Sequence, residues 1–456
     1  MGRIAIIGGG ISGLSLAYFL IEKDPELEVT VFESEKRPGG KIWTDRAEGF
    51  LCEWGVNGFL DNRPMTLALS KKLSLSPLRS NDASRKRFIF SGGMLHRLPE
   101  SPPAFLTSRL LSLPGKLRVM AETIVRGNAK EEETLADFAR RRLGTEAYQK
   151  LIDPMASGIY AGNAETLSLR ACFPKVYDLE RKYGGLIRGM LKLQKEKKKL
   201  GSKDKVGAGP GGVLTSYYNG MGELIQTLKE VMGDRLRLGY RGASLDRKGK
   251  GYIQHFSDGS SCEADAVVLA SPAYATAEIL RNFDKKLSAL VSEIPYPSLS
   301  VACFGFRKEK IRADLAAFGY LIPSREKRKI LGTLYDSSIF PNRAPEGYVL
   351  LRSMIGGARA SDLAMEQEPR LIEIIRKELA DIIGITAEPD FVRIYRHEMA
   401  IPQYTVGHVE RLKNIDAALG KHQGLFLTGN AYRGVSVNDC IENSAKLAEK
   451  IIEESF

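Results

Sequence analysis

The sequence predicts a protein of mixed α/β and α+β architecture, with a Rossmann-like domain assembled from segments that lie far apart in the chain. Three observations support this fold class. Residues 3–33 have the strand–turn–helix–strand order of a parallel βαβ unit. A strand, a glycine-rich loop and a helix follow one another again over 424–454. Between them the chain is mainly helical over 104–200 and rich in strand-like runs over 297–400.

The first element is an apolar strand that leads through a glycine-rich turn into a helix beginning near Ile11. In that turn Gly8 suits the tight bend, Gly10 lets the backbone approach a pyrophosphate, and Gly13 lets the helix pack closely on the strand. A second strand ends at Glu33, twenty residues past Gly13, where a carboxylate can accept hydrogen bonds from a ribose. This spacing predicts that the segment binds a nucleotide.

Three further segments favour FAD over NAD. The second strand is followed by Arg37-Pro-Gly-Gly40-Lys41, which offers positive charge and backbone amides to a second anionic group. Residues 53–59 place glycines on both sides of Asn57, where the backbone can approach a flat ring. The C-terminal strand ends in Gly429 and leads through 434–439 into a second helix N-terminus. An FAD molecule that spans both helix N-termini accounts for all three segments.

Sequence periodicity and turn signals predict the other elements. In chain order they are a hairpin with strands 86–90 and 94–98, helices 133–140 and 177–200, a disordered linker at 201–212, a helix at 223–231, strands 264–270, 298–306, 330–336 and 348–355, a helix at 369–384, strand 391–396, strand 425–428 and helix 439–454.

Length and composition restrict the class of protein. A chain of 456 residues exceeds one ordinary hydrophobic core, so two or three domains are expected. No stretch approaches the roughly 20 uncharged apolar residues that span a bilayer. The first strand begins by residue 3, which leaves no room for a signal peptide and predicts a cytoplasmic protein. The cysteines form no CxxC pair, so neither metal binding nor a disulfide is expected of Cys52, Cys172, Cys262, Cys303 and Cys440.

Much of the net charge of +12 lies in two basic runs, 140–142 and 192–205. Solvated helix faces and a surface loop would explain such runs, and so would an anionic membrane surface or an acidic substrate. Nucleic acid is disfavoured as a partner, because no recognition motif or aromatic-interleaved basic platform accompanies the charge.

Longer motifs resemble the amine-oxidase-like flavoprotein superfamily and, within it, the flavin-dependent protoporphyrinogen/coproporphyrinogen oxidases. Many flavoproteins share the glycine fingerprint. The stretches 158–162 (Gly-Ile-Tyr-Ala-Gly), 401–408 (Ile-Pro-Gln-Tyr-Thr-Val-Gly-His) and 437–441 (Val-Asn-Asp-Cys-Ile) are much more specific. The matching segments run almost end to end and are 8–13, 37–40, 86–99, 139–144, 157–163, 167–174, 401–408 and 429–441.

This resemblance implies an FAD-binding domain, a β-sheet-containing substrate domain and a helical insert of the membrane-binding type. Their expected boundaries are 1–84, 211–295 and 405–456 for the FAD-binding domain, 296–404 for the substrate domain, and 85–210 for the insert, with a basic loop at 192–212.

The resemblance also implies the cofactor site. FAD would be bound non-covalently, because Cys440 lies past the C-terminal loop, at the start of the helix. The adenine contact stays open between Tyr240 and Arg241. The cofactor contacts that it implies are Gly8, Gly9, Gly10, Ile11, Ser12, Gly13, Glu33, Arg37, Gly40, Lys41, Gly55, Val56, Asn57, Gly58, Gly429, Val435, Ser436 and Val437.

For the substrate, the resemblance implies that Arg87 pairs with a propionate and that Asn57 and Gly158 also contact the ring system. The implied reaction is the FAD-dependent, oxygen-utilising, six-electron oxidation of protoporphyrinogen IX to protoporphyrin IX in heme biosynthesis. Hydride would leave a meso carbon for flavin N5, and no side chain is singled out as a catalytic base.

The alternative substrate is coproporphyrinogen III. More remote alternatives are an amine oxidase, a carotene desaturase, a flavin-dependent isomerase and an FAD-binding protein without turnover. The expected partners are the porphyrinogen and O2. A homodimer and the inner face of the cell membrane are further candidates.

Overall fold

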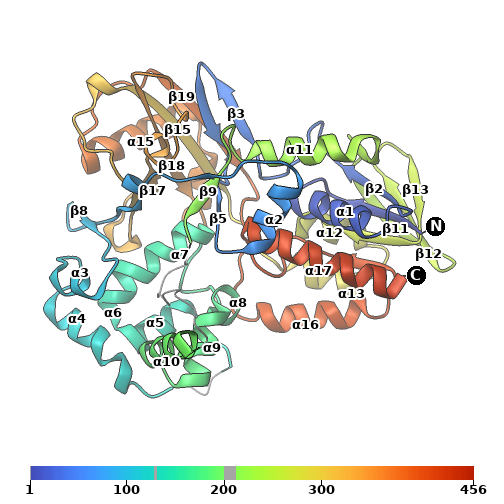
Figure 1. The fold of residues 1–456 in the computed structure, drawn as a ribbon, viewed down its shortest axis with the longest axis horizontal. Helices are drawn as coiled ribbons and strands as arrows, with labels where there is room; N and C mark the ends of the chain where they lie inside the picture. The colour runs from blue at the N-terminus through green and yellow to red at the C-terminus, as the bar shows by residue number, and fades with distance from the viewer. Residues whose placement is uncertain (1, 128–130, 200–211, 456) are drawn as a thin grey trace.

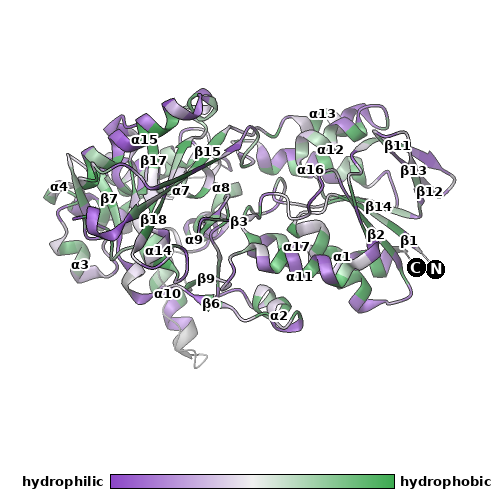
Figure 2. Ribbon diagram, turned by 90° about the horizontal axis from the view of Figure 1, so that it is seen from above, coloured by the Kyte–Doolittle hydropathy of each residue, from purple (hydrophilic) through white to green (hydrophobic). Residues whose placement is uncertain are grey.

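The computed structural model describes residues 2–127, 131–199 and 212–455. The chain forms a mixed α/β fold with a parallel sheet near both termini and a larger, mainly antiparallel sheet at the opposite end (Figures 1 and 2). A group of helices lies beside the larger sheet (Figure 1). None of the helices in these described ranges is both long enough and apolar enough to cross a membrane.

The parallel sheet is built from three distant parts of the chain. Its strand order is β10 (Leu236–Leu238), β2 (Glu28–Glu33), β1 (Arg3–Ile7), β14 (Ala266–Leu269) and β20 (Leu425–Leu427). Strands β1, β14 and β20 are short, apolar and largely buried, as expected of a parallel sheet that is covered on both faces, whereas the edge strand β10 is partly exposed.

Alternate side chains of this sheet enter two separate cores. Ile4 and Ile6 pack against α1 (Ile11–Lys23), α11 (Gly222–Met232) and α17 (Val437–Ser455). Ala5 and Ile7 enter the second core. That core is covered by α12 (Ala273–Leu280), α13 (Lys285–Ser292), α16 (His408–Leu419) and the small sheet of β11 (Gly242–Lys248), β12 (Gly251–Phe256) and β13 (Ser261–Ala264).

The larger sheet has seven strands, and α15 (Glu368–Ile383) packs on one of its faces. All neighbours are antiparallel except the pair of β7 and β16. The strand order is β19 (Phe391–His397), β15 (Leu299–Arg307), β18 (Tyr348–Gly356), β17 (Ile330–Leu334), β16 (Gly319–Leu321), β7 (Arg87–Ser91) and β8 (Met94–Arg97).

The hairpin predicted at 86–98 is present as β7 and β8, but it does not belong to the helical part. Strand β7 pairs with β16, from Arg87 opposite Gly319 to Ile89 opposite Leu321. The domain boundary expected at residue 85 is therefore wrong, and the helical part begins at Pro102. A local sequence pattern is enough to predict the hairpin. Which sheet the hairpin joins depends on its pairing with β16, a strand more than 200 residues later in the chain.

The helical part also differs from expectation. The single helix predicted at 177–200 is two helices, because Gly184 adopts a left-handed conformation (φ +76°) that ends the first of them. The basic residues from Lys192 to Lys199 lie in the second helix, not in a loop, and positions 200–211 of the predicted basic loop and linker fall outside the described residues. The helices are α3 (Pro102–Thr107), α4 (Leu113–Met120), α5 (Leu135–Leu143), α6 (Thr145–Ala147), α7 (Asp153–Tyr160), α8 (Leu169–Cys172), α9 (Pro174–Tyr183) and α10 (Leu186–Lys199).

Further short elements lie outside the two large sheets. They are β3 (Thr44–Ala47) with β4 (Phe50–Glu53), the three-stranded sheet of β5 (Phe59–Leu60), β9 (Leu214–Ser216) and β6 (Leu78–Arg79), and the helices α2 (Pro64–Lys72) and α14 (Asp336–Ile339).

Candidate functional site

The glycine turn lies between β1 and α1, at the carboxyl end of the parallel sheet. Gly8 has φ +120°, and a Cβ on it would lie 2.8 Å from the carbonyl carbon of Ala270. A Cβ on Gly13 would overlap with the carbonyl oxygen of Gly8. At Gly10, by contrast, a Cβ would have no described neighbour within 4 Å. No described side chain caps α1 at Gly10, so its first N–H groups are available to an anion.

Glu33 lies beside this turn, where the spacing predicts it. Its carboxylate Oε2 accepts a hydrogen bond of 2.8 Å from the N–H of Gly9, and Oε1 accepts one of 2.9 Å from the N–H of Glu35. The neighbouring Tyr240 donates its N–H to the Glu33 carbonyl at 2.8 Å, and its ring packs edge-on against Phe32 and Phe256. The nucleotide end of the predicted site is therefore a packed, well-defined part of the fold.

The second glycine pair meets the first turn directly. The N–H of Gly39 donates to the carbonyl of Gly9 at 2.8 Å, and Gly10 and Gly39 form an isolated β-bridge. A Cβ on Gly40 would have the Cα of Gly10, at 3.5 Å, as its neighbour. The glycine turn 8–13 and the segment 37–40, which are separate in the sequence, thus face each other without side chains between them.

The basic residues of the second segment lie in an aromatic environment. The guanidinium of Arg37 stands 4.5 Å from the Trp43 ring and 4.7 Å from the Trp54 ring. Lys41 donates to the carbonyl of Met399 at 2.8 Å, and burial lowers the pKa of both cations. This arrangement suits an anionic group of a cofactor, because a partly desolvated cation attracts an anion more strongly than a fully solvated one does.

Trp54 and His397 belong to the same cluster, and sequence reasoning missed both. Nε2 of His397 lies 3.0 Å from the Trp54 carbonyl oxygen, and burial lowers the pKa of this histidine. A Cβ on Gly55 would lie 3.5 Å from the Lys41 carbonyl oxygen and 4.0 Å from His397 Nε2. For Trp54, the sequence held one signal of a role in the site: its position inside the predicted segment 53–59.

Asn57 carries the clearest indication that this segment binds a ligand. Both the nitrogen and the oxygen of its side-chain amide are buried and lack a hydrogen-bond partner among the described residues. Leaving such groups unsatisfied costs about 1–3 kcal/mol each, so a ligand that bonds to them fits the site. The following Gly58 packs against the Thr215 carbonyl of β9, which leaves no space for a Cβ.

The C-terminal loop brings the second predicted helix N-terminus beside the first. Ser436 and Asp439 cap α17: the Ser436 hydroxyl donates to the Asp439 carboxylate at 2.6 Å and accepts from the Asp439 N–H at 3.1 Å. Ser444, two turns into α17, donates to the Ser12 carbonyl at 2.8 Å, which fastens α17 to the beginning of α1. Gly429, with φ +124°, lies near the Ala270 carbonyl next to the first turn.

Two of the three predicted substrate residues meet on strand β16. Arg87 lies opposite Gly319 in the sheet, and its guanidinium stands 4.9 Å from the Phe318 ring. Within the described ranges, no carboxylate lies within ion-pair distance of Arg87, and burial lowers its pKa. A Cβ on Gly158 of α7 would lie 2.9 Å from Leu321. In the described part of the chain, no contact joins Asn57 to Arg87 or to Gly158.

The segment 401–408 packs against three other segments that carry the resemblance, 157–163, 167–174 and 429–441. Gln403 donates its side-chain amide to the Tyr160 carbonyl at 2.8 Å. The Tyr404 hydroxyl donates to the Asn430 carbonyl at 2.6 Å, and the Tyr404 carbonyl accepts from the Ser168 N–H at 2.8 Å. The helical part and the C-terminal loop are therefore joined through the segment 401–408.

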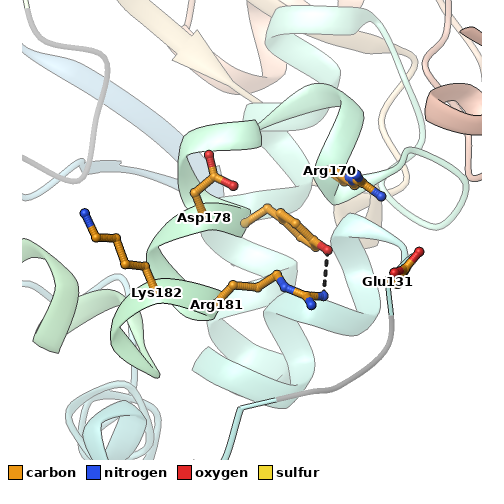
Figure 3. A pocket seen from close by; sticks show the side chains of 6 residues that line it. Glu131, Arg170, Asp178, Arg181 and Lys182 are labelled. Atoms are coloured by element: carbon orange, nitrogen blue, oxygen red, sulfur yellow. Dashed lines mark hydrogen bonds between the residues drawn. The ribbon is translucent and has the colours of Figure 1, made fainter. Parts of the chain in front are cut away.

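A hollow of about 580 Å³ lies elsewhere, on the helical part (Figure 3). Tyr177 accepts a hydrogen bond of 2.9 Å from Arg181 there, and Arg170 lies 5.5 Å from the same ring. None of the predicted cofactor or substrate residues lines this hollow, whose walls are Glu131, Arg170, Tyr177, Asp178, Arg181 and Lys182.

Residues 11–452 match the sequence profile of the family described as flavin containing amine oxidoreductase. The chain belongs to this family. Flavin containing amine oxidoreductases are flavin-dependent oxidoreductases, so a flavin cofactor and redox catalysis follow for this chain.

Relatives within the flavin containing amine oxidoreductases include two curated enzymes. The chloroplastic protoporphyrinogen oxidase of Oryza sativa subsp. japonica is 34% identical over 98% of this chain and 87% of its own length. The coproporphyrinogen III oxidase of Bacillus subtilis (strain 168) is 30% identical over 96% of both chains. A crystal structure from Exiguobacterium sp. 255-15, provisionally assigned as a protoporphyrinogen oxidase, superimposes with a TM-score of 0.83, with 27% identity and 99% of both chains covered.

Proposed function

We propose that this flavin oxidoreductase binds FAD non-covalently and oxidises a porphyrinogen to the porphyrin with O2, in heme biosynthesis, with protoporphyrinogen IX as the substrate. The observation that carries the proposal is the similarity, over nearly the whole chain, to enzymes named for porphyrinogen oxidation. The proposal also assigns FAD binding to the parallel sheet with its helices, and substrate binding to the seven-stranded sheet.

The residues present fit FAD. The uncapped N-terminus of α1 and the open faces of Gly10 and Gly40 suit the pyrophosphate, and Glu33 suits a ribose. The buried, unpartnered amide of Asn57 suits the edge of a flat ring system. Burial raises the pKa of Cys440 to about 11, so its thiol stays protonated and is a poor nucleophile, which supports non-covalent binding.

When bound, FAD supplies a two-electron acceptor that O2 reoxidises with release of H2O2, so a six-electron oxidation takes three rounds. The protein residues bind and orient the substrate. Arg87 would hold a propionate, because it is exposed at the start of β7, its guanidinium stacks on Phe318, and it forms no ion pair in the described structure. Gly158 would let α7 approach β16 where the substrate ring lies. We assign no side chain as a base.

A paired turnover assay tests this proposal. The purified, FAD-loaded protein is given protoporphyrinogen IX and, separately, coproporphyrinogen III, while porphyrin fluorescence and O2 consumption are followed together. We expect both signals with protoporphyrinogen IX. Bound FAD with no fluorescence from either substrate would overturn the proposal.

Coproporphyrinogen III is the alternative substrate, and one observation favours it. The B. subtilis enzyme named for this substrate is 30% identical to the chain over 96% of both proteins. A clear preference for coproporphyrinogen III in the same assay would select this alternative and keep the reaction class.

We propose further that the helical part contacts an anionic membrane peripherally. Large apolar side chains are 51–79% exposed on α3, α4, α10 and the 3₁₀ turn Ala121–Ile124: Leu106, Leu113, Leu117, Met120, Ile124 and Leu191. Exposed apolar residues beside basic ones are typical of surfaces that rest on lipid headgroups.

A further inference from the structure

Arg352 is an arginine that no solvent reaches. It lies on β18 of the seven-stranded sheet, is 1% exposed, and forms an ion pair with Asp336, also 1% exposed, at 2.9 Å. Removing two charges from water is costly, and a well-packed apolar pair would often be at least as stable. The pair therefore points to a role in geometry more than in stability.

The guanidinium of Arg352 also holds the turn 53–55, which lies outside its own sheet. Its Nη1 donates to the carbonyl oxygens of Glu53, at 3.3 Å, and of Gly55, at 3.1 Å. Both carbonyls flank Trp54, whose ring stacks on Arg37. Arg352 and Arg87 belong to the same seven-stranded sheet. Through Arg352, this sheet thus fixes the backbone that leads to Asn57.

The same turn is held from the other side by the Glu53 side chain. Its carboxylate accepts the N–H of Met221 and the hydroxyl of Thr44, both at 2.7 Å. These partners lie at the start of α11 and on β3, so the turn is held between Arg352 of the seven-stranded sheet and the beginning of α11, which packs on the parallel sheet. Residues beyond the turn, Asn57 and Gly58, then have little freedom.

We propose that Arg352 is a positioning residue that sets the place of Gly55 and Asn57 against the flavin and so aligns the flavin site with the substrate sheet. This inference rests on the proposed FAD site. Asn57 can use its unpartnered amide only if the backbone before it is held, because an error of about 1 Å in such a site can cost about 100-fold in rate. No bond to Arg352 is made or broken in the reaction.

The first test compares Arg352→Lys with Arg142→Lys. Lysine keeps a charge for the buried carboxylate but lacks the planar fork, in which Nε pairs with Asp336 while Nη1 reaches the two carbonyls. Arg142 is the matched control, because it is equally buried and ion-paired with Glu122 at 3.1 Å in the helical part. Each apoprotein is titrated with FAD, and flavin fluorescence quenching and the visible absorption band are recorded without substrate.

For Arg352→Lys we expect FAD to bind about tenfold more weakly, with a visible band closer to that of free FAD and kcat/KM about 100-fold lower. Arg142→Lys should keep the wild-type band and affinity. Wild-type affinity and an unchanged band in Arg352→Lys would overturn the inference. A wild-type protein that binds no FAD would instead overturn the proposed function.

The double variant Arg352→Met/Asp336→Asn guards against a folding defect, since it leaves no unpaired buried charge. We expect it to unfold near the wild-type temperature and still show the weaker FAD binding and the altered band. If it binds FAD as the wild type does, Arg352 contributes only to stability and the inference is wrong.

Discussion

Glu53 shows at the level of a single residue how burial can make stability depend on pH. Its carboxyl is fully buried, and this desolvation raises its pKa from 4.5 to about 7 although Arg343 and Arg352 lie nearby. Between these two values the folded state holds a proton that the unfolded state has released. The free energy of unfolding therefore falls as pH rises from 4.5 to about 7.

Glu53→Gln should remove this dependence, because the amide keeps an oxygen for the Met221 N–H and does not ionise. Over that pH interval, the wild type should lose about 3 kcal/mol relative to the variant. Denaturant unfolding of both proteins at several pH values from about 4.5 to above 7 measures the difference. A wild-type-to-variant difference that does not change with pH would contradict the prediction.

Arg87→Ala tests the substrate residue on β7. Loss of a charge-assisted hydrogen bond to a propionate, worth about 1.5–3 kcal/mol, should raise KM roughly 10- to 100-fold with a smaller effect on kcat. Arg97→Ala is the control, since Arg97 lies on the paired strand β8, is exposed and bonds to Glu100. Steady-state kinetics with the preferred porphyrinogen distinguish them, and equal KM values in both variants would remove Arg87 from the site.

At the level of elements, a buried carboxylate determines where α10 begins. Glu122 accepts the N–H groups of Leu186, at 2.7 Å, and Ile187, at 3.1 Å, and pairs with Arg142. The two glycines before α10 end α9 but do not by themselves start a new helix. The sequence therefore predicted one long helix, because a capping carboxylate from 64 residues earlier leaves no local signal.

Glu122→Ala should loosen the helical part specifically. It removes the cap of α10 and leaves the buried Arg142 without one of its carboxylates, for a loss of about 3–5 kcal/mol. Hydrogen exchange should quicken in α10 and remain slow in the parallel sheet. Glu196→Ala, an exposed position on α10, provides the control, and equal exchange rates in the two variants would contradict the proposed role of the cap.

On the scale of the whole molecule, the apolar residues exposed on the helical part predict a response to lipid. Ile124 is 79% exposed, so Ile124→Glu should fold normally and lose attachment to vesicles of phosphatidylglycerol. Val231→Glu, at a 48% exposed position on α11, should bind as the wild type does. Cosedimentation with phosphatidylglycerol and phosphatidylcholine vesicles, repeated at high salt, measures this. A wild-type protein that stays in the supernatant with both lipids would refute the membrane contact.

The sequence by itself determined the first βαβ unit with its glycine turn, the position of Glu33, the hairpin at 86–98 and the strand–loop–helix at the C-terminus. Each of these depends on spacing within a few dozen residues, where strand alternation, glycine positions and helix periodicity act locally. The cofactor class and the family resemblance could be inferred for the same reason.

Only the tertiary structure decided that the hairpin extends the seven-stranded sheet, that Arg37 lies between two indole rings and that Arg352 holds the turn before Asn57. These contacts join residues up to about 300 positions apart. Which strand edges and side chains meet over such separations is settled by packing of the whole core, and no local pattern records that choice.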